Sequence, residues 1–151
     1  MEIVDHVDTL ARELRACDGY DLARFAGWAL YRAATYPAVM SDTTPATDLA
    51  RLLWDGVTDL PDHIHLHASD DPDQQALAEE IEAAAQLAVT AFTDADPEAA
   101  AGVAEVIFNI ILFATYPHEK TPVAEEMAAQ HAMAHAILNA QPNLRVEGVG
   151  I

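Results

Sequence analysis

Only one cysteine, Cys17, occurs among the 151 residues of the chain. A lone cysteine excludes an internal disulfide framework and fits a reducing compartment, so we expect a cytoplasmic protein. No neighbouring motif supports a catalytic thiol. We therefore interpret Cys17 as a small, half-buried hydrophobic residue.

Long apolar runs are missing as well, and none reaches the length that a bilayer crossing requires. The first residues, "MEIVDHVDTLARELRACDGY", are acidic and helical in period, with no basic stretch followed by an apolar one. This pattern is unlike a secretory signal. We expect no membrane partner.

Basic residues are scarce, and Lys120 is the only lysine. Seven basic residues oppose 25 acidic ones, for a formal net charge of −18. Such a surface repels nucleic acid phosphates and anionic lipids, so we expect no nucleic acid partner. Two other interpretations stay open: a halophile-type surface adapted to a salty cytoplasm, or attraction to a basic protein partner.

What the chain does have is apolar spacing at three and four residues, which predicts amphipathic helices. Six such stripes occur, at residues 3–14, 22–33, 49–60, 77–92, 103–116 and 123–138. We predict an all-α fold, a six-helix bundle formed by a single domain, residues 1–151. The fifth stripe is apolar nearly all round, so Asn109 within it is expected to be buried against the Tyr31 or Tyr36 hydroxyl.

Four helix starts are marked by a capping residue before proline, at Thr44–Pro45, Asp71–Pro72, Asp96–Pro97 and Thr121–Pro122. The tetrapeptide "ATYP" follows the second stripe, at residues 34–37, and recurs at the end of the fifth, at residues 114–117. This echo predicts two three-helix halves related by internal duplication. Their approximate bounds are 1–60 and 72–140, with a loop at 61–71 and a C-terminal tail at 141–151.

Three histidines, His63, His65 and His67, alternate within the loop "PDHIHLHASDDPD". In an extended segment they would point to one side, and imidazoles on one side suit zinc, nickel or copper. The competing interpretation is an exposed loop in which Ile64 and Leu66 cover the core. A second pair, His131 and His135, lies one helical turn apart and could share an ion, or the two could be ordinary histidines of the helix surface.

Carboxylates are abundant, but none is marked by a catalytic motif, and nucleophile elbows and phosphate-binding glycine loops are missing. We therefore expect no enzyme activity and no cofactor, or, under the metal hypothesis, a divalent transition metal such as zinc. The acidic loop and the following helix are the predicted contacts for a basic protein partner, through Asp62, Asp70, Asp71, Asp73, Glu79, Glu80 and Glu82. The sequence permits a homodimer without requiring one.

Core-type residues also carry a family resemblance over residues 22–140: Phe25–Ala26, Arg32, Tyr36–Pro37, Leu53–Trp54 and the alanine-rich segment 78–107. With these residues the chain resembles YjaG-like all-helical bacterial proteins and the immunity proteins encoded beside toxins. The chain departs from their pattern at Tyr31, where an acidic residue is usual. The resemblance implies a helical fold and a non-enzymatic, immunity-like or antitoxin-like role, and it supplies no site residues.

Overall fold

The computed structural model describes residues 2–36, 42–66, 70–114 and 120–139. Within these residues the chain forms six α-helices and no strand, which confirms the predicted all-α bundle. The helices are α1 (Ile3–Leu14), α2 (Gly19–Thr35), α3 (Thr44–Trp54), α4 (Pro72–Thr93), α5 (Pro97–Ala114) and α6 (Lys120–Leu138). None of the helices in these ranges combines the length and apolar character that a bilayer crossing requires.

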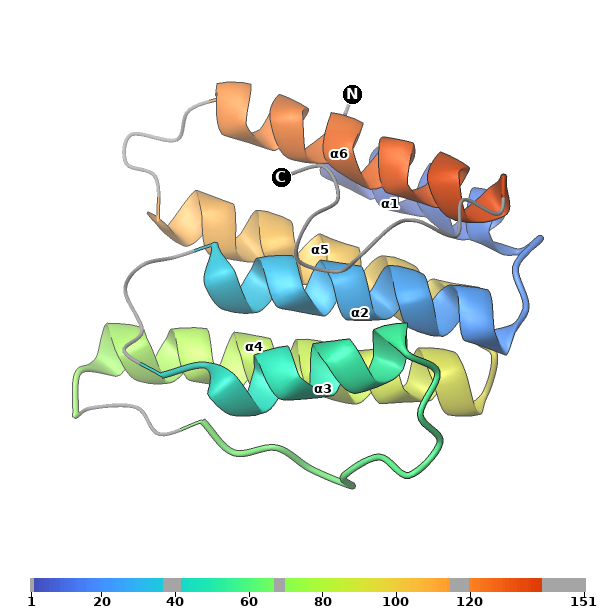
Figure 1. Cartoon of the computed structure of the whole chain (residues 1–151). Helices are drawn as coiled ribbons and strands as arrows, with labels where there is room; N and C mark the ends of the chain where they lie inside the picture. The colour runs from blue at the N-terminus through green and yellow to red at the C-terminus, as the bar shows by residue number, and fades with distance from the viewer. Residues whose placement is uncertain (1, 37–41, 67–69, 115–119, 140–151) are drawn as a thin grey trace.

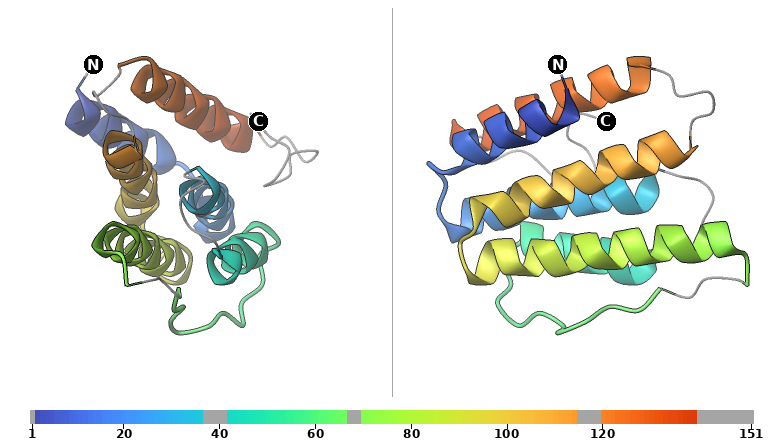
Figure 2. Two further views of the ribbon diagram at one scale, coloured as in Figure 1. Left: turned by 90° about the vertical axis from the view of Figure 1, so that its left-hand side faces the viewer. Right: turned by 180° about the vertical axis from the view of Figure 1, so that it is seen from behind.

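The helices lie in three layers of two, with α1 and α6 in one outer layer, α2 and α5 in the middle, and α3 and α4 in the other (Figure 1). The end-on view in Figure 2 shows the same layers. Each layer therefore takes one helix from each predicted half of the chain. The halves interleave and do not pack as separate units, and most of the second "ATYP" copy lies outside the described residues. The duplication stays a prediction.

Helix starts follow the capping pattern of the sequence. The Asp71 side chain accepts a hydrogen bond from the Asp73 N–H at 3.0 Å, and Asp96 accepts one from Glu98 at 3.0 Å. Two predicted starts shift. The cap of α3 is Thr43 rather than Thr44, and α6 begins at Lys120, before the Thr121–Pro122 pair. Proline is compatible with both shifts. It lacks an N–H group, but the N–H groups of the first helical turn have no acceptor within the helix, so no hydrogen bond is lost.

The core is built around the middle layer, where large side chains of α2 and α5 are enclosed by alanines. Phe25, Trp28 and Phe108 are fully buried. The prediction for Asn109 is wrong: this residue is exposed, and its amide donates to Glu80 Oε2 at 3.4 Å. Asn109 lies one turn after the exposed Glu105, so both share the outward stripe of α5.

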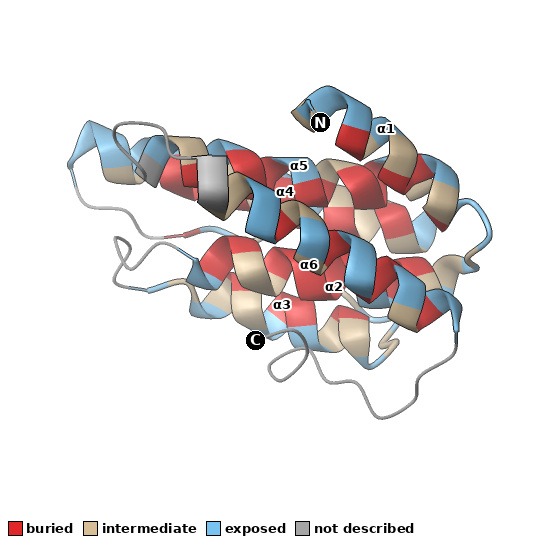
Figure 3. Cartoon of the chain, turned by 90° about the horizontal axis from the view of Figure 1, so that it is seen from above, coloured by how far each residue is buried: buried red, intermediate tan, exposed pale blue. Residues whose placement is uncertain are grey.

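Helix α6 is attached differently from the others. It buries three apolar side chains within the described residues, Met133, Ala134 and Ile137, beside the polar Glu126 and Gln130. Viewed from above, α6 lies on the outside and exposes positions along its length (Figure 3). Apolar burial is therefore a smaller part of its attachment than for α2 or α5.

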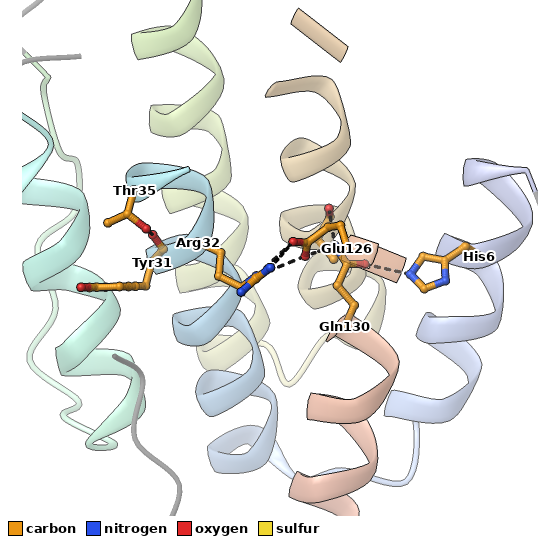
Figure 4. A network of polar contacts seen from close by, with 7 residues as sticks. His6, Tyr31, Arg32, Thr35, Glu126 and Gln130 are labelled. Atoms are coloured by element: carbon orange, nitrogen blue, oxygen red, sulfur yellow. Dashed lines mark hydrogen bonds and ion pairs between the residues drawn. The ribbon is translucent and has the colours of Figure 1, made fainter. Parts of the chain in front are cut away.

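A buried polar network supplies the remaining attachment (Figure 4). Arg32 of α2 donates from Nε to Glu126 Oε1 at 3.1 Å and also from Nη2, while its guanidinium lies 5.0 Å from the centre of the Trp28 ring. The Gln130 amide donates to Glu126 Oε2 at 3.0 Å and to the Ala104 carbonyl at 3.1 Å. Its oxygen must then accept from His6 Nε2, 2.8 Å away on α1. The network joins α6 to α1, α2 and α5.

The close approach of α2 and α3 generates a prediction for Gly27. A Cβ at this position would lie 2.7 Å from the Ala50 carbonyl oxygen and 3.2 Å from Leu53 Cβ. Helix propensity alone would favour alanine by up to about 1 kcal/mol, but overpacking costs about 1–3 kcal/mol. Gly27→Ala should therefore lower the free energy of unfolding in urea.

Gly102→Ala is the matched control, because its nearest neighbour is Leu87 Cδ1 at 3.2 Å, the end of a side chain that can rotate away. This control should be neutral or stabilising by up to about 1 kcal/mol. Equal unfolding free energies for the two variants would show that the backbones of α2 and α3 are not in close contact at Gly27.

Candidate functional site

The chain leaves α3 through a tight turn that directs it back along α4. Gly56 adopts a positive φ of 71°, its N–H donates to the Leu53 carbonyl, and the Val57 N–H donates to Leu52. These two bonds form a Schellman cap, which needs a residue such as glycine in the left-handed region. The cap sends residues 57–66 along the outer face of the α3–α4 layer (Figure 1).

Residues 63–66 alternate between solvent and core. His63 and His65 are exposed, whereas Ile64 is half-buried against the core and Leu66 is buried. The Leu66 N–H donates to Glu82 Oε1 of α4 at 2.9 Å, which fixes this segment against the helix. The alternation agrees with an extended segment whose histidines share one side.

A cavity of about 330 Å³ lies between this segment and α4, and we call it the acidic pocket. Its carboxylates are Asp62, Glu79 and Glu82, and none of the described residues that line it is Lys or Arg. The remaining lining residues are two histidines and a set of apolar, small or amide side chains: Leu49, Pro61, His63, Ile64, His65, Ala83, Ala85, Gln86 and Val89. The pocket therefore combines an apolar wall with negative charge.

The structure separates the predicted partner residues into three groups. Asp62, Glu79 and Glu82 line the acidic pocket. Asp70, Asp71 and Asp73 are exposed at the start of α4, where Asp71 caps the helix. Glu80 is directed to α5, where its carboxylate accepts the bond from Asn109. Successive residues of a helix point about 100° apart, so Glu80 faces away from the side of α4 that holds Glu79 and Glu82, and the run of glutamates does not form one surface.

The two predicted histidine groups differ in how many ligands the structure assembles. His67 lies outside the described residues, so the site of His63, His65 and His67 stays a prediction. His131 and His135 share a face of α6, with ring centres 4.4 Å apart. Among the described residues, the group of three potential metal ligands that lie close together is Glu13, His131 and His135. Sequence spacing did not indicate Glu13, which comes from the other end of the chain.

Cys17, in the turn between α1 and α2, is half-buried as predicted. Burial, together with the negative charges of Asp21 and Asp18, raises the pKa of the Cys17 thiol from its ordinary value of 9.0 to about 11. The thiolate is therefore scarce at neutral pH, which argues against a nucleophilic role.

The raised pKa predicts slow alkylation of Cys17 by iodoacetamide at pH 8. The thiolate fraction falls about 100-fold relative to a thiol of ordinary pKa, and the greater nucleophilicity of a more basic thiolate restores up to about tenfold. The folded chain should therefore react roughly tenfold more slowly than the urea-unfolded chain. Its rate should keep rising with pH beyond pH 10, and a plateau near pH 9 would contradict the shift.

Comparison with family models, curated proteins and solved structures found no match for this chain. The resemblance to YjaG-like and immunity proteins therefore stays an expectation that rests on the core-type residues alone.

Proposed function

We propose that this chain is a non-enzymatic protein-binding domain that recognises a basic partner through the acidic pocket. The observation that carries the proposal is the composition of that pocket, in which three carboxylates and apolar side chains line one cavity and none of the described lining residues is lysine or arginine. A lysine or arginine side chain matches this combination, because its aliphatic stem packs on apolar surface while its charged end remains polar.

The charge of the whole chain supports the same partner. A net charge of −18 attracts a basic surface over long distance, and a concave site lined by one sign of charge concentrates that field. Electrostatic steering raises association rates more than it raises affinity, so a neutraliser that must capture its target quickly benefits most. An immunity-like or antitoxin-like domain that covers the basic surface of a toxin fits this physical description.

The pocket walls are held in place before any partner arrives, which favours recognition further. The bond from Leu66 to Glu82 fixes the loop to α4, and Ile64 packs on the core. A preformed site avoids much of the entropy cost of ordering a loop on binding.

The test is a nuclear magnetic resonance titration of the chain at physiological salt with a short peptide of alternating arginine and glycine. Its neutral twin carries citrulline in place of arginine. The arginine peptide should shift the amide signals of residues 62–66 and of the α4 face that holds Glu79 and Glu82. The citrulline peptide should not.

A pair of double variants separates the pocket from general charge. Asp62→Asn with Glu79→Gln removes two pocket charges and leaves Glu82 to hold the loop. Because a charge-assisted hydrogen bond contributes roughly 1.5–3 kcal/mol, affinity should fall at least about tenfold. Glu105→Gln with Glu125→Gln removes two exposed charges elsewhere and should have a much smaller effect.

An equal loss in both double variants, or shifts spread over the whole surface, would contradict a specific pocket. Unfolding of the chain at low salt, measured by circular dichroism, would instead support a halophile-type surface whose acidity reflects only the solvent. A concentration-dependent sedimentation profile would identify the homodimer that the sequence permits.

A further inference from the structure

The outer layer opposite the acidic pocket contains a second group of chemistry-bearing residues. Glu13 lies in the last turn of α1, while His131 and His135 lie one turn apart on the adjacent α6. Figure 2 shows these two helices side by side at one edge of the bundle. The potential ligand atoms of the three residues all lie within 4.8 Å of one another.

One oxygen of the Glu13 carboxylate lies where a bound cation would stabilise it, although the side chain as a whole is 24% exposed. Its Oε2 atom is buried and has no hydrogen bond within the described part of the chain, although His131 Nδ1 lies 3.2 Å away. A buried acceptor without a donor costs roughly 1–3 kcal/mol, and more when it is charged. The C-terminal end of a helix also disfavours negative charge, because the macrodipole is negative there.

The two histidines would be the other ligands, and their side chains have room to change conformation. Both are exposed, and the side chain of His131 is 51% exposed. In a tetrahedral zinc site with bonds of about 2.0–2.1 Å, ligand atoms lie about 3.3 Å apart. Side-chain rotations of exposed histidines can achieve the required contraction without movement of either helix.

We propose that Glu13, His131 and His135 bind zinc or a similar divalent transition metal, which links α1 to α6. Two imidazoles and one carboxylate form a donor set suited to this class of ion. Three protein ligands leave one tetrahedral position open, and the exposure of the histidines directs that position to solvent. A water molecule or a group of a partner protein can fill it.

The metal would neutralise the buried Glu13 oxygen and join two helices that otherwise share limited contact. The site belongs to the α1–α6 layer and the acidic pocket to the α3–α4 layer. It is therefore independent of the proposed function, and peptide binding at the pocket should not require zinc.

The test is a calorimetric titration of zinc into the chelator-treated full chain at pH 7.5, where most imidazole is neutral. We expect saturable binding of one zinc per chain. Changing groups that merely orient metal ligands typically costs 10–100-fold in affinity, so loss of a ligand should cost at least about tenfold. Glu13→Gln and His135→Ala should each show this loss.

The matched control is the double variant His63→Ala with His65→Ala, which should bind zinc as tightly as the unaltered chain. Zinc should also raise the melting temperature of the unaltered chain and of this control, but not that of Glu13→Gln. Without zinc, Glu13→Gln should be at least as stable as the unaltered chain, because it removes the charge of a partly buried carboxylate whose Oε2 atom lacks a hydrogen bond.

No saturable binding, or unchanged affinity in Glu13→Gln, would overturn the proposal. Loss of binding in the loop control alone would also overturn it and would assign the metal to the segment of His63 and His65.

Discussion

The arrangement of the outer α1–α6 layer depends on one ion pair, between the partly buried Arg32 of α2 and the buried Glu126 of α6. Glu126 is 2% exposed and accepts hydrogen bonds from both Arg32 and Gln130. A buried carboxylate is tolerated only when it is paired and fully hydrogen-bonded. The pair therefore determines where α6 can lie on α2, because any slip of one turn would leave the charge unpaired.

Gln130 extends the constraint on the position of α6 to two further helices, α5 and α1. Its amide reaches the Ala104 carbonyl of α5 and, through its oxygen, His6 of α1. The His6 ring also packs edge-on against Phe108, with ring centres 5.5 Å apart. One side of α6 is thereby fixed by polar contacts. His131 lies next to Gln130 in the chain, so its place beside Glu13 follows from the same constraint.

The two proposed sites depend on different physical forces. The acidic pocket lies on the α3–α4 layer, where apolar packing and the Gly56 cap hold the walls. The Glu13, His131 and His135 group lies on the layer that polar bonds attach. A ligand at the first site would bind a surface whose walls these contacts already hold. A metal at the second would strengthen an attachment in which apolar burial plays a smaller part.

Local patterns in the sequence were sufficient to predict where the helices lie. Apolar spacing and caps such as Asp71 and Asp96 depend on residues a few positions apart, so they can be read from the chain directly. Asn109 shows how such reading can fail: its neighbours are apolar, but its helical phase matches the exposed Glu105. Phase along the helix was the better guide than local composition.

Long-range polar pairs could not be predicted in the same way. Nothing in the spacing of His131 and His135 points to Glu13, because their contact depends on how α1 packs on α6. One signal was present in Arg32, which lies one turn after Trp28 on the buried side of α2. A charge in that position requires an acidic partner, although the sequence does not identify Glu126 as the one.

The most direct test that this ion pair positions α6 is a double-mutant cycle on Arg32 and Glu126, in which the free energies of unfolding in urea are measured. Arg32→Met should cost about 3–5 kcal/mol, because it leaves a buried carboxylate unpaired. Arg32→Met with Glu126→Met should cost clearly less than the sum of the single variants. Arg15→Met is the control, since Arg15 and Glu98 are 4.0 Å apart and largely exposed, and it should cost under about 1 kcal/mol.

Additive costs in the cycle, or an Arg32→Met variant as stable as Arg15→Met, would contradict the claim that this ion pair positions α6.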